Sequence, residues 1–390
     1  MLKTKLPVEV QLVWGTMTCR AMRDYYEGEN HPCKWFSRYG PFPAYDWIKD
    51  FPYVKKGRIL EVVYAGKRYQ VPELLSGCRK APIMSIGINP NLKAFRKYSM
   101  KIKNPDKSKT ITERTKISFQ EYGLRRIYPY FDDIKQYAHH FRKRTIYKHM
   151  ITKKVFFNSQ ENQEFVYEIG KRLTIKQETV RMYTSYKGIL ELFKKEAGFR
   201  GANLVLGEDI SYYNMIACGS PKWQTRIEEE GGIPDEKIRK GLVNECFNKR
   251  KYLKRQIIQS NPKVIILFGQ PIADAFMTEF DKYFIGRLPY RIPKPGSRIS
   301  DLIKQNNFVI EFGGNRIRVI FSPHATGSFI YAKLKCKERI VKALLEEVGP
   351  GKLELDKKTK HLKKTEGPCH FCSNDLYQIE GGCMYDKLEK

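Results

Sequence analysis

Short apolar runs alternate with longer amphipathic segments along much of the chain. Four of these runs are bounded by Gly, Pro or polar residues, which is typical of buried strands: 83–88, 203–206, 264–268 and 316–321. Strands that alternate with helices predict a parallel sheet with helices on both faces. The expected fold class is therefore α/β, a three-layer sandwich around a central, mostly parallel, four-stranded sheet.

Helical periodicity separates the predicted strands. Apolar residues recur at helical spacing in four segments: 178–197, 236–260, 272–280 and 328–348. The second segment is followed by Asn261-Pro262 and the last by Gly349-Pro350, and such pairs are typical helix ends. We therefore expect each segment to form one continuous helix.

Composition divides the chain into three parts. An irregular, aromatic N-terminal extension covers residues 1–75 and contains a predicted hairpin at 58–71. Residues 76–350 hold the predicted sheet and helices, interrupted by a basic insertion at 91–155. Residues 351–390 form a tail that is rich first in Lys and then in Cys. The middle part is where a catalytic site is expected.

Charge indicates a partner. The 390 residues include 72 Lys and Arg and 42 Asp and Glu, so the formal net charge is +30. Tyr and Phe are interleaved with the basic residues of the insertion, among which Arg142, Lys143, Arg144 and Lys148 are candidates for phosphate contacts. A cationic groove with aromatic platforms suits double- or single-stranded DNA. A solvated Lys-rich surface is the alternative.

Several protein classes are excluded by composition. No apolar run approaches the roughly 18 residues that a membrane-spanning helix needs, and the first residues lack the apolar stretch of a secretory signal. Nine cysteines, an odd number in a long chain, do not indicate a disulfide scaffold. We expect a monomer without a membrane partner. Its expected location is the cytoplasm, associated with the nucleoid, or the nucleus if the source is eukaryotic.

Polar loops follow three of the predicted strands or lie just beyond them. They read SIGINPN (85–91), LGEDISYYNMIACGSP (206–221) and VIFSPHATG (319–327). The carboxyl ends of parallel strands meet at one edge of a sheet, which is where ligands bind in such folds. The three loops are therefore expected to form one site.

These loops resemble motifs of the uracil-DNA glycosylase superfamily. GINPN (87–91) is similar to the first motif of the mismatch-specific and single-strand-selective branches, and YYNMIACGSP (212–221) to the Asn-x-x-x-Cys-x-x-Pro stretch of the iron–sulfur branch. PKVIILFGQPIADAF (262–276) resembles the strand and helix that follow in that branch, and VIFSPHATG stands where the family has a His-Pro-Ser loop. The likeness covers about residues 76–348 at the level of motifs.

The resemblance implies a monofunctional DNA glycosylase. Such an enzyme flips a base out of the strand and hydrolyses its N-glycosidic bond, which leaves an abasic site. The expected substrate is uracil or a modified pyrimidine, in DNA repair or in defence against modified viral DNA. Lyase activity is not predicted, because no Lys lies in the motif loops as a Schiff-base nucleophile.

Three residues carry the expected catalytic roles. Asn89 would hold the attacking water, and the amide of Asn214 would read the edge of a pyrimidine, because it offers a donor and an acceptor together. His324 would donate to the charge that develops on the departing base. The order Ser322-Pro323-His324 inverts the family pattern, so Ser322 is an alternative to His324. Each of the three also has a structural alternative, as a turn, cap or backbone-bound residue.

Further candidates surround these three. Tyr213, Phe95 and Gly87 complete the base-binding set, with Phe95 as one of several aromatic residues that could stack on a flipped base. The backbone amide of Thr326, which precedes a predicted helix, could bind a phosphate.

The cysteines suggest a metal. Cys218 and Cys246 match two cluster ligands of the iron–sulfur branch, whereas Cys369, Cys372 and Cys383 in the tail suit Zn or a cluster corner. The tail would either bind its own Zn, with His361 or His370 as fourth ligand, or join Cys218 and Cys246; reduced thiols are the alternative. The chemistry itself requires no cofactor, so a bound Zn or iron–sulfur cluster would be structural.

Two other functions fit parts of the sequence. One is a non-catalytic nucleic-acid-binding module on the same fold. The other is a metal-dependent nuclease that holds Mg²⁺ with Glu208-Asp209 or with Asp132-Asp133.

Overall fold

The computed structural model of the chain describes residues 31–33, 78–88, 181–218, 223, 233, 235–325 and 328–365. The predicted hairpin at 58–71 and the basic insertion at 91–155 lie outside these residues, as does the Cys-rich end of the tail. Within the described ranges, no helix combines the length and the apolar character needed to cross a membrane.

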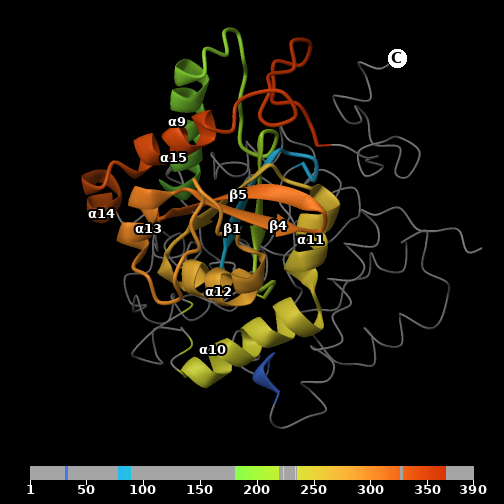
Figure 1. The fold of residues 1–390 in the computed structure, drawn as a ribbon, viewed down its shortest axis with the longest axis vertical. Helices are drawn as coiled ribbons and strands as arrows, with labels where there is room; N and C mark the ends of the chain where they lie inside the picture. Colours follow the sequence, from blue (N-terminus) through green and yellow to red (C-terminus); the bar gives the residue numbers. More distant parts are fainter. Residues whose placement is uncertain are drawn as a thin grey trace, which may run out of the picture.

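The centre of the fold is a five-stranded, mostly parallel sheet in the order β2-β1-β3-β5-β4 (Figure 1). Its strands are β1 (Ile83–Gly87), β2 (Ile210–Asn214), β3 (Val264–Phe268), β4 (Phe308–Phe312) and β5 (Asn315–Ser322). Four strands are parallel, and β4 is antiparallel to β5. The predicted α/β class is confirmed, with one strand more than expected. The additional strand β4 forms a hairpin with β5 through Gly313-Gly314, which both adopt the positive φ that a tight hairpin turn requires.

The strand predicted at 203–206 is wrong. Leu206 forms only an isolated bridge with Ile210, and the strand itself begins at Ile210. Between them the chain turns: the Asp209 carboxylate accepts a hydrogen bond of 2.7 Å from the backbone N–H of Val205. Leu204 and Leu206 are buried in the core, so this apolar run reflects burial of a loop and not strand pairing.

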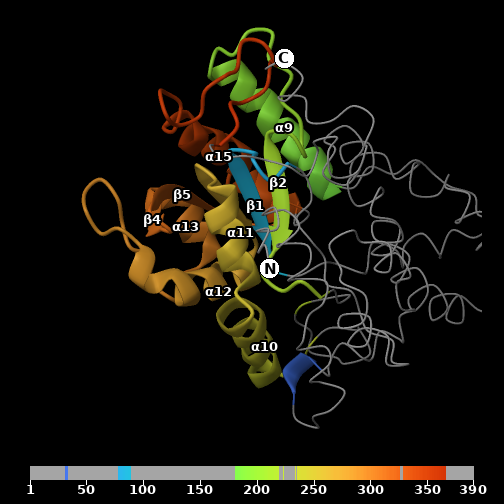
Figure 2. The same ribbon diagram turned by 90° about the vertical axis from the view of Figure 1, so that its right-hand side faces the viewer.

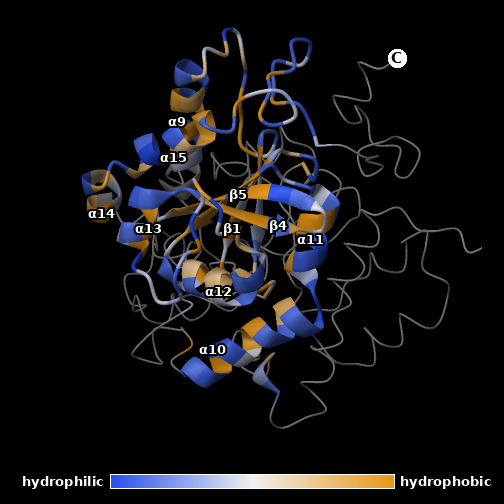
Figure 3. Ribbon diagram, viewed as in Figure 1, coloured by the Kyte–Doolittle hydropathy of each residue, from blue (hydrophilic) through white to orange (hydrophobic). Residues whose placement is uncertain are grey.

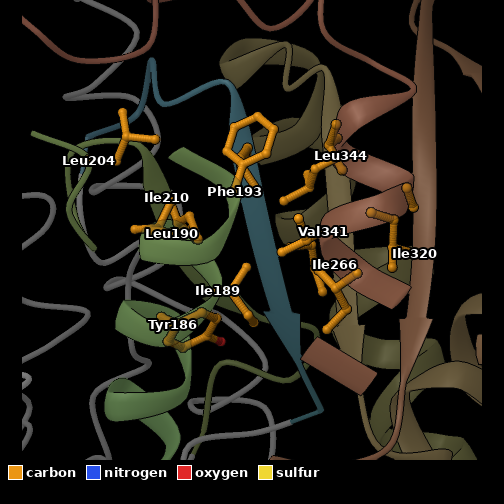
Figure 4. Close-up of a cluster of buried hydrophobic side chains, with 14 of the residues drawn as sticks. Tyr186, Ile189, Leu190, Phe193, Leu204, Ile210, Ile266, Ile320, Val341 and Leu344 are labelled. Carbon is orange, nitrogen blue, oxygen red and sulfur yellow. The ribbon is translucent and has the colours of Figure 1, made fainter. Parts of the chain in front are cut away.

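Two helices cover one face of the sheet. α9 (Arg181–Glu196) and α15 (Cys336–Leu345) lie side by side on this face (Figures 1 and 2). Their apolar side chains and those of the strands form one continuous core (Figure 4), which includes Tyr186, Ile189, Leu190, Phe193, Ile266, Ile320, Val341 and Leu344. The short helix α13 (Ile299–Gln305) packs beside α15 and β5.

The opposite face is covered by α11 (Tyr252–Ser260) and α12 (Gln270–Phe280), as Figure 2 shows. An aromatic cluster fills this side: the rings of Phe276 and Phe280 stack at 4.1 Å, and Phe280 also meets Phe247 and Phe312 edge-on, each at 5.1 Å. Helices on both faces of one sheet give the predicted three layers. Figure 3 shows hydrophobic and hydrophilic stripes on α10 (Glu236–Val243), as expected of an amphipathic helix.

Two of the predicted helices are interrupted. The segment 236–260 contains α10, a π-helical segment η5 (Asn244–Lys249) and α11, with Lys251 in a left-handed conformation between the last two. The buried Glu245 supports this break, because its carboxylate lies 2.9 Å from Arg250 Nε and 3.0 Å from Lys249 Nζ. The segment 328–348 likewise contains α14 (Ser328–Lys333) and α15, divided at the left-handed Lys335.

The other two helix predictions are confirmed, α9 within 178–197 and α12 over 272–280. α12 begins two residues earlier than expected and has Pro271 in its first turn. A 3₁₀ turn, η6 (Asp281–Tyr283), follows α12 directly.

The first part of the predicted tail packs against the amino edge of the sheet. Asp209 accepts a hydrogen bond of 2.7 Å from the backbone N–H of Leu362, and its other oxygen lies 3.0 Å from His361 Nδ1. Glu208 forms an ion pair of 3.2 Å with Lys364. These groups are buried, and Leu362 belongs to the hydrophobic core, so residues up to 365 are part of the folded domain.

Candidate functional site

The carboxyl ends of four parallel strands meet at one edge of the sheet. Gly87 at the end of β1 is in register with Asn214 at the end of β2, and Phe268 of β3 is in register with Ser322 of β5. The pairing of β1 with β2 continues past the strands, because the backbone N–H of Ile216 donates to the carbonyl of Ile88 at 2.8 Å. The strand order reverses beside β1, and ligands of such sheets bind outside the carboxyl ends at this kind of position.

A compact polar contact lies over the end of β1. The Tyr212 hydroxyl donates a hydrogen bond of 3.0 Å to Asn214 Oδ1. A Cβ atom at Gly87 would collide with Asn214 Oδ1 and would lie 2.5 Å from Tyr212 Oη. A larger residue at position 87 would therefore displace the Asn214 amide or the Tyr212 hydroxyl. We call Gly87, Tyr212 and Asn214 the amide cluster.

The hydrogen bond defines how the Asn214 amide faces its surroundings. Asn214 is only 3% exposed, and a buried amide is stable only when it is hydrogen-bonded. Because Oδ1 accepts from Tyr212, the nitrogen of the amide is directed away from that hydroxyl. The amide therefore presents its donor and its acceptor on different sides.

Tyr213 and Tyr212 lie on opposite faces of β2, because successive strand residues alternate. The predicted base-binding residue Tyr213 is buried on the face opposite to Asn214. Tyr212, which the motif comparison does not single out, is the neighbour that contacts Asn214. The period of two in the sequence ISYYN would have identified it, since residues 212 and 214 share a face.

A second buried hydrogen bond, between β1 and α9, supports the same edge of the sheet. Ser85 Oγ and Tyr186 Oη are 2.6 Å apart, and both side chains are buried. Tyr186 also meets the ring of Phe268 edge-on at 5.5 Å. These contacts join α9 to β1 and β3. Ser85 lies two residues before Gly87 in β1, so the contacts hold the strand ends in a fixed arrangement.

Ser322 is directed into the protein. It is fully buried, and its hydroxyl donates to the backbone carbonyl of Pro323 at 3.0 Å. The same hydroxyl hydrogen-bonds the thiol of Cys336, and burial raises the pKa of that thiol to about 11. Ser322 therefore helps to pack the start of α15 against β5.

His324 is directed outward beside the end of β3. Its side chain is exposed, and its Cβ and Cδ2 atoms lie 3.8 and 3.7 Å from the position that a Cβ of Gly269 would take. The backbone N–H of Gly269 donates to the carbonyl of Ser322 at 2.8 Å, which holds the two strand exits together. Partial desolvation by the surrounding chain lowers the pKa of His324 below its usual value.

The structure brings Gly87, Asn214 and His324 to one edge of the sheet, where the side chains of Tyr213 and Ser322 are buried. The predicted site residues that lie outside the described ranges are Asn89, Phe95, Thr326, Arg142, Lys143, Arg144, Lys148, Cys369, Cys372 and Cys383. Asn89 directly follows Ile88, the last described residue of the first motif.

The described cysteines do not form a metal centre by themselves. Cys218 and Cys246 are buried thiols, the first shortly after β2 and the second within η5. Among the described residues, no three His, Cys, Asp or Glu side chains are grouped so that they could hold a metal ion. The carboxylates of Glu208 and Asp209 bind Lys364 and His361 at the amino edge of the sheet, away from the strand ends that carry the amide cluster. A structural role explains this pair better than Mg²⁺ binding.

Comparison with known proteins gives no relatives on which to base a function. No family model matches the chain, and no curated protein matches it. The function must therefore be argued from the residues at the edge of the sheet.

The amide cluster predicts that position 87 tolerates only glycine. Gly87→Ala should displace the Asn214 amide and reduce the free energy of unfolding by roughly 1–3 kcal/mol, as overpacking does. Denaturant unfolding measures this loss. Gly188→Ala in α9 is the matched control, because a Cβ there would come no closer than 3.7 Å to another residue. It should raise stability by up to about 1 kcal/mol. A Gly87→Ala variant as stable as the parent protein would contradict the proposed crowding.

The environment of His324 predicts a low titration point. Its Cε1–H signal in an NMR pH titration, assigned with His324→Gln, should give a pKa below the ordinary value of about 6.5. Because the folded state disfavours the protonated ring, the unfolded state takes up the proton at a higher pH than the folded state. The free energy of unfolding should therefore decrease as the pH is lowered through about 6.5. A pKa at or above the ordinary value would show that the ring is not desolvated.

Proposed function

We propose that the protein is a monofunctional DNA glycosylase that excises uracil or a modified pyrimidine and leaves an abasic site. The observation that carries the proposal is geometric: the buried, hydrogen-bonded amide of Asn214 lies at the same edge of a parallel sheet as His324. The motif resemblance of residues 87–91, 212–221 and 319–327 agrees with this arrangement.

The reaction assigns a task to each group. Cleavage of the N-glycosidic bond develops positive charge on the sugar and negative charge on the departing base, so the site needs donors that are already in place. The Asn214 amide would donate to a carbonyl oxygen of the base, and His324 would donate to a second oxygen. Asn89 would position the attacking water. The amide orientation set by Tyr212 favours a base with an oxygen at position 4 over one with an amino group there.

His324 is a better candidate than Ser322 for the third motif. Ser322 is buried and its hydroxyl is engaged with Pro323 and Cys336, whereas His324 is exposed at the strand edge. A neutral imidazole can donate one hydrogen bond to the departing base without already carrying charge. We therefore assign the donor role to His324.

The short helix that follows His324 carries features that suit DNA opening. Phe329 and Ile330 of α14 are 74% and 54% exposed. Lys333 lies over the Phe329 ring at 5.7 Å. Apolar side chains at a basic surface can enter the base stack and offset part of the cost of base flipping. The formal charge of +30 would supply the phosphate contacts.

The remaining parts of the proposal concern partners and setting. The partner is DNA, the protein acts as a monomer, and the chemistry requires no cofactor. Whether the role is repair or defence depends on the base that is released. Repair predicts uracil, and defence predicts a modified pyrimidine of viral DNA.

An abasic-site assay tests the proposal. DNA that contains uracil and modified viral DNA are incubated with the full chain, and abasic sites are scored after alkaline cleavage. Asn214→Ala should lower the single-turnover rate by about 10²- to 10³-fold, the loss typical of a donor to developing charge. Asn203→Ala, an exposed asparagine at the amino edge, is the matched control and should leave the rate unchanged.

The same assay separates the rival functions. Salt-dependent DNA binding without abasic sites on either DNA would favour the non-catalytic binding module. Strand scission that EDTA abolishes would favour a metal-dependent nuclease. Either outcome would contradict the glycosylase proposal.

A further inference from the structure

The chain between η6 and α13 has an unusual composition. Residues 284–298 contain four basic residues and no Asp or Glu: Arg287, Arg291, Lys294 and Arg298. Figure 2 shows this segment projecting outward beside β4. We call it the basic loop. It is separate from the three motif loops and from the amide cluster.

One end of the basic loop is fixed to the edge strand of the sheet. The backbone N–H of Ile285 donates to the backbone carbonyl of Val309 at 2.9 Å. The backbone N–H of Arg291 donates to the backbone carbonyl of Asn307 at 3.2 Å. The Asn307 side chain donates to the carbonyl of Pro289 at 2.7 Å. These bonds cover part of the outer edge of β4, which would otherwise present unpaired backbone groups.

The other end is fixed to the edge that carries the candidate site. Gln270, the first residue of α12, donates to the carbonyl of Ser297 at 3.0 Å and accepts from the backbone N–H of Ile299 at 2.8 Å. Gln270 directly follows Gly269, against which His324 packs. The basic loop is therefore held in a defined position relative to the strand end beside His324.

The tip of the basic loop exposes apolar and basic side chains together. Leu288 is 94% exposed and Ile292 is 51% exposed. Arg287 and Arg291, which flank them in the chain, are also exposed. Among the residues that the structure describes, the four cations from Arg287 to Arg298 make no ion pair with a carboxylate. A fixed loop that exposes basic side chains and a leucine together has the composition of a binding surface.

We infer that the basic loop is a second DNA-docking surface, which binds the strand outside the candidate site. Its guanidinium and ammonium groups would contact phosphates, and Leu288 would pack against sugars or base edges between them. DNA fits better than an acidic protein segment, because DNA presents a regular row of phosphates with apolar sugar and base surface beside it. Because both ends are anchored, little ordering would be needed on binding. This docking role does not depend on the excision reaction.

DNA binding at a series of salt concentrations tests the inference. Fluorescence anisotropy measures the affinity of the full chain for a labelled duplex. Arg287→Ala/Arg291→Ala should weaken binding on the order of tenfold and reduce the slope of log K against log salt by about 2, close to 0.9 for each lost phosphate contact. Leu288→Ala should weaken binding several-fold with an unchanged slope, because it removes no charge.

A charge-matched control makes the result specific. Lys195→Ala/Arg200→Ala removes two exposed charges at the end of α9 and in the chain leading to the amino end of β2. It should leave affinity and slope nearly unchanged. An equal loss in this control, or no loss in the loop variant, would overturn the inference, as would poly-glutamate displacing the DNA at equal charge concentration. If the parent protein makes no abasic sites but shows the loop-dependent slope, the glycosylase proposal fails and the docking surface stands.

Discussion

The register of β1 with β2 places the hydrogen-bonded pair Tyr212 and Asn214 over Gly87, and the candidate site depends on that placement. Only when residue 214 lies beside residue 87 does the amide rest on the bare backbone of the glycine. The register in turn is maintained by the core on the α9 face and by the Ser85–Tyr186 hydrogen bond. A shift of one residue would move Asn214 to the other face of the sheet.

Charged and uncharged groups divide the work in the proposed function. The groups proposed to act at the strand ends are the buried amide of Asn214, which carries no charge, and the exposed imidazole of His324. The cationic groups lie around them, on the exposed basic loop and near the exposed apolar residues of α14. In the proposed function, binding energy from phosphates would be gained at the surface, while the base would be read by groups at the strand ends. The net charge of +30 alone predicts the partner but not this separation.

The sequence predicts what local patterns encode. The apolar runs of β1, β3 and β5 are recognisable, because each is short and closed by a turn or polar loop. The strand β2 is missed, because its sequence ISYYN is less apolar than residues 203–206 just before it. That more apolar run resembles a strand but is buried as a loop. The helix break at Lys251 accompanies ion pairs of the buried Glu245 with Lys249 and Arg250, which helical periodicity alone does not reveal. The motif predicts that Asn214 lies at the same edge as Gly87, whereas the contact of Tyr212 with Asn214 and the anchoring role of Gln270 follow only from the packed structure.

The identity of the base released from DNA tests the central claim most directly, namely that the Asn214 amide reads the base edge. Free bases released by the parent protein and by Asn214→Asp are separated and identified by mass spectrometry. The parent protein should release a base with an oxygen at position 4. Asn214→Asp replaces the donor with an acceptor and should shift release toward a base with an amino group there. The same released base from both proteins, at similar rates, would contradict the account.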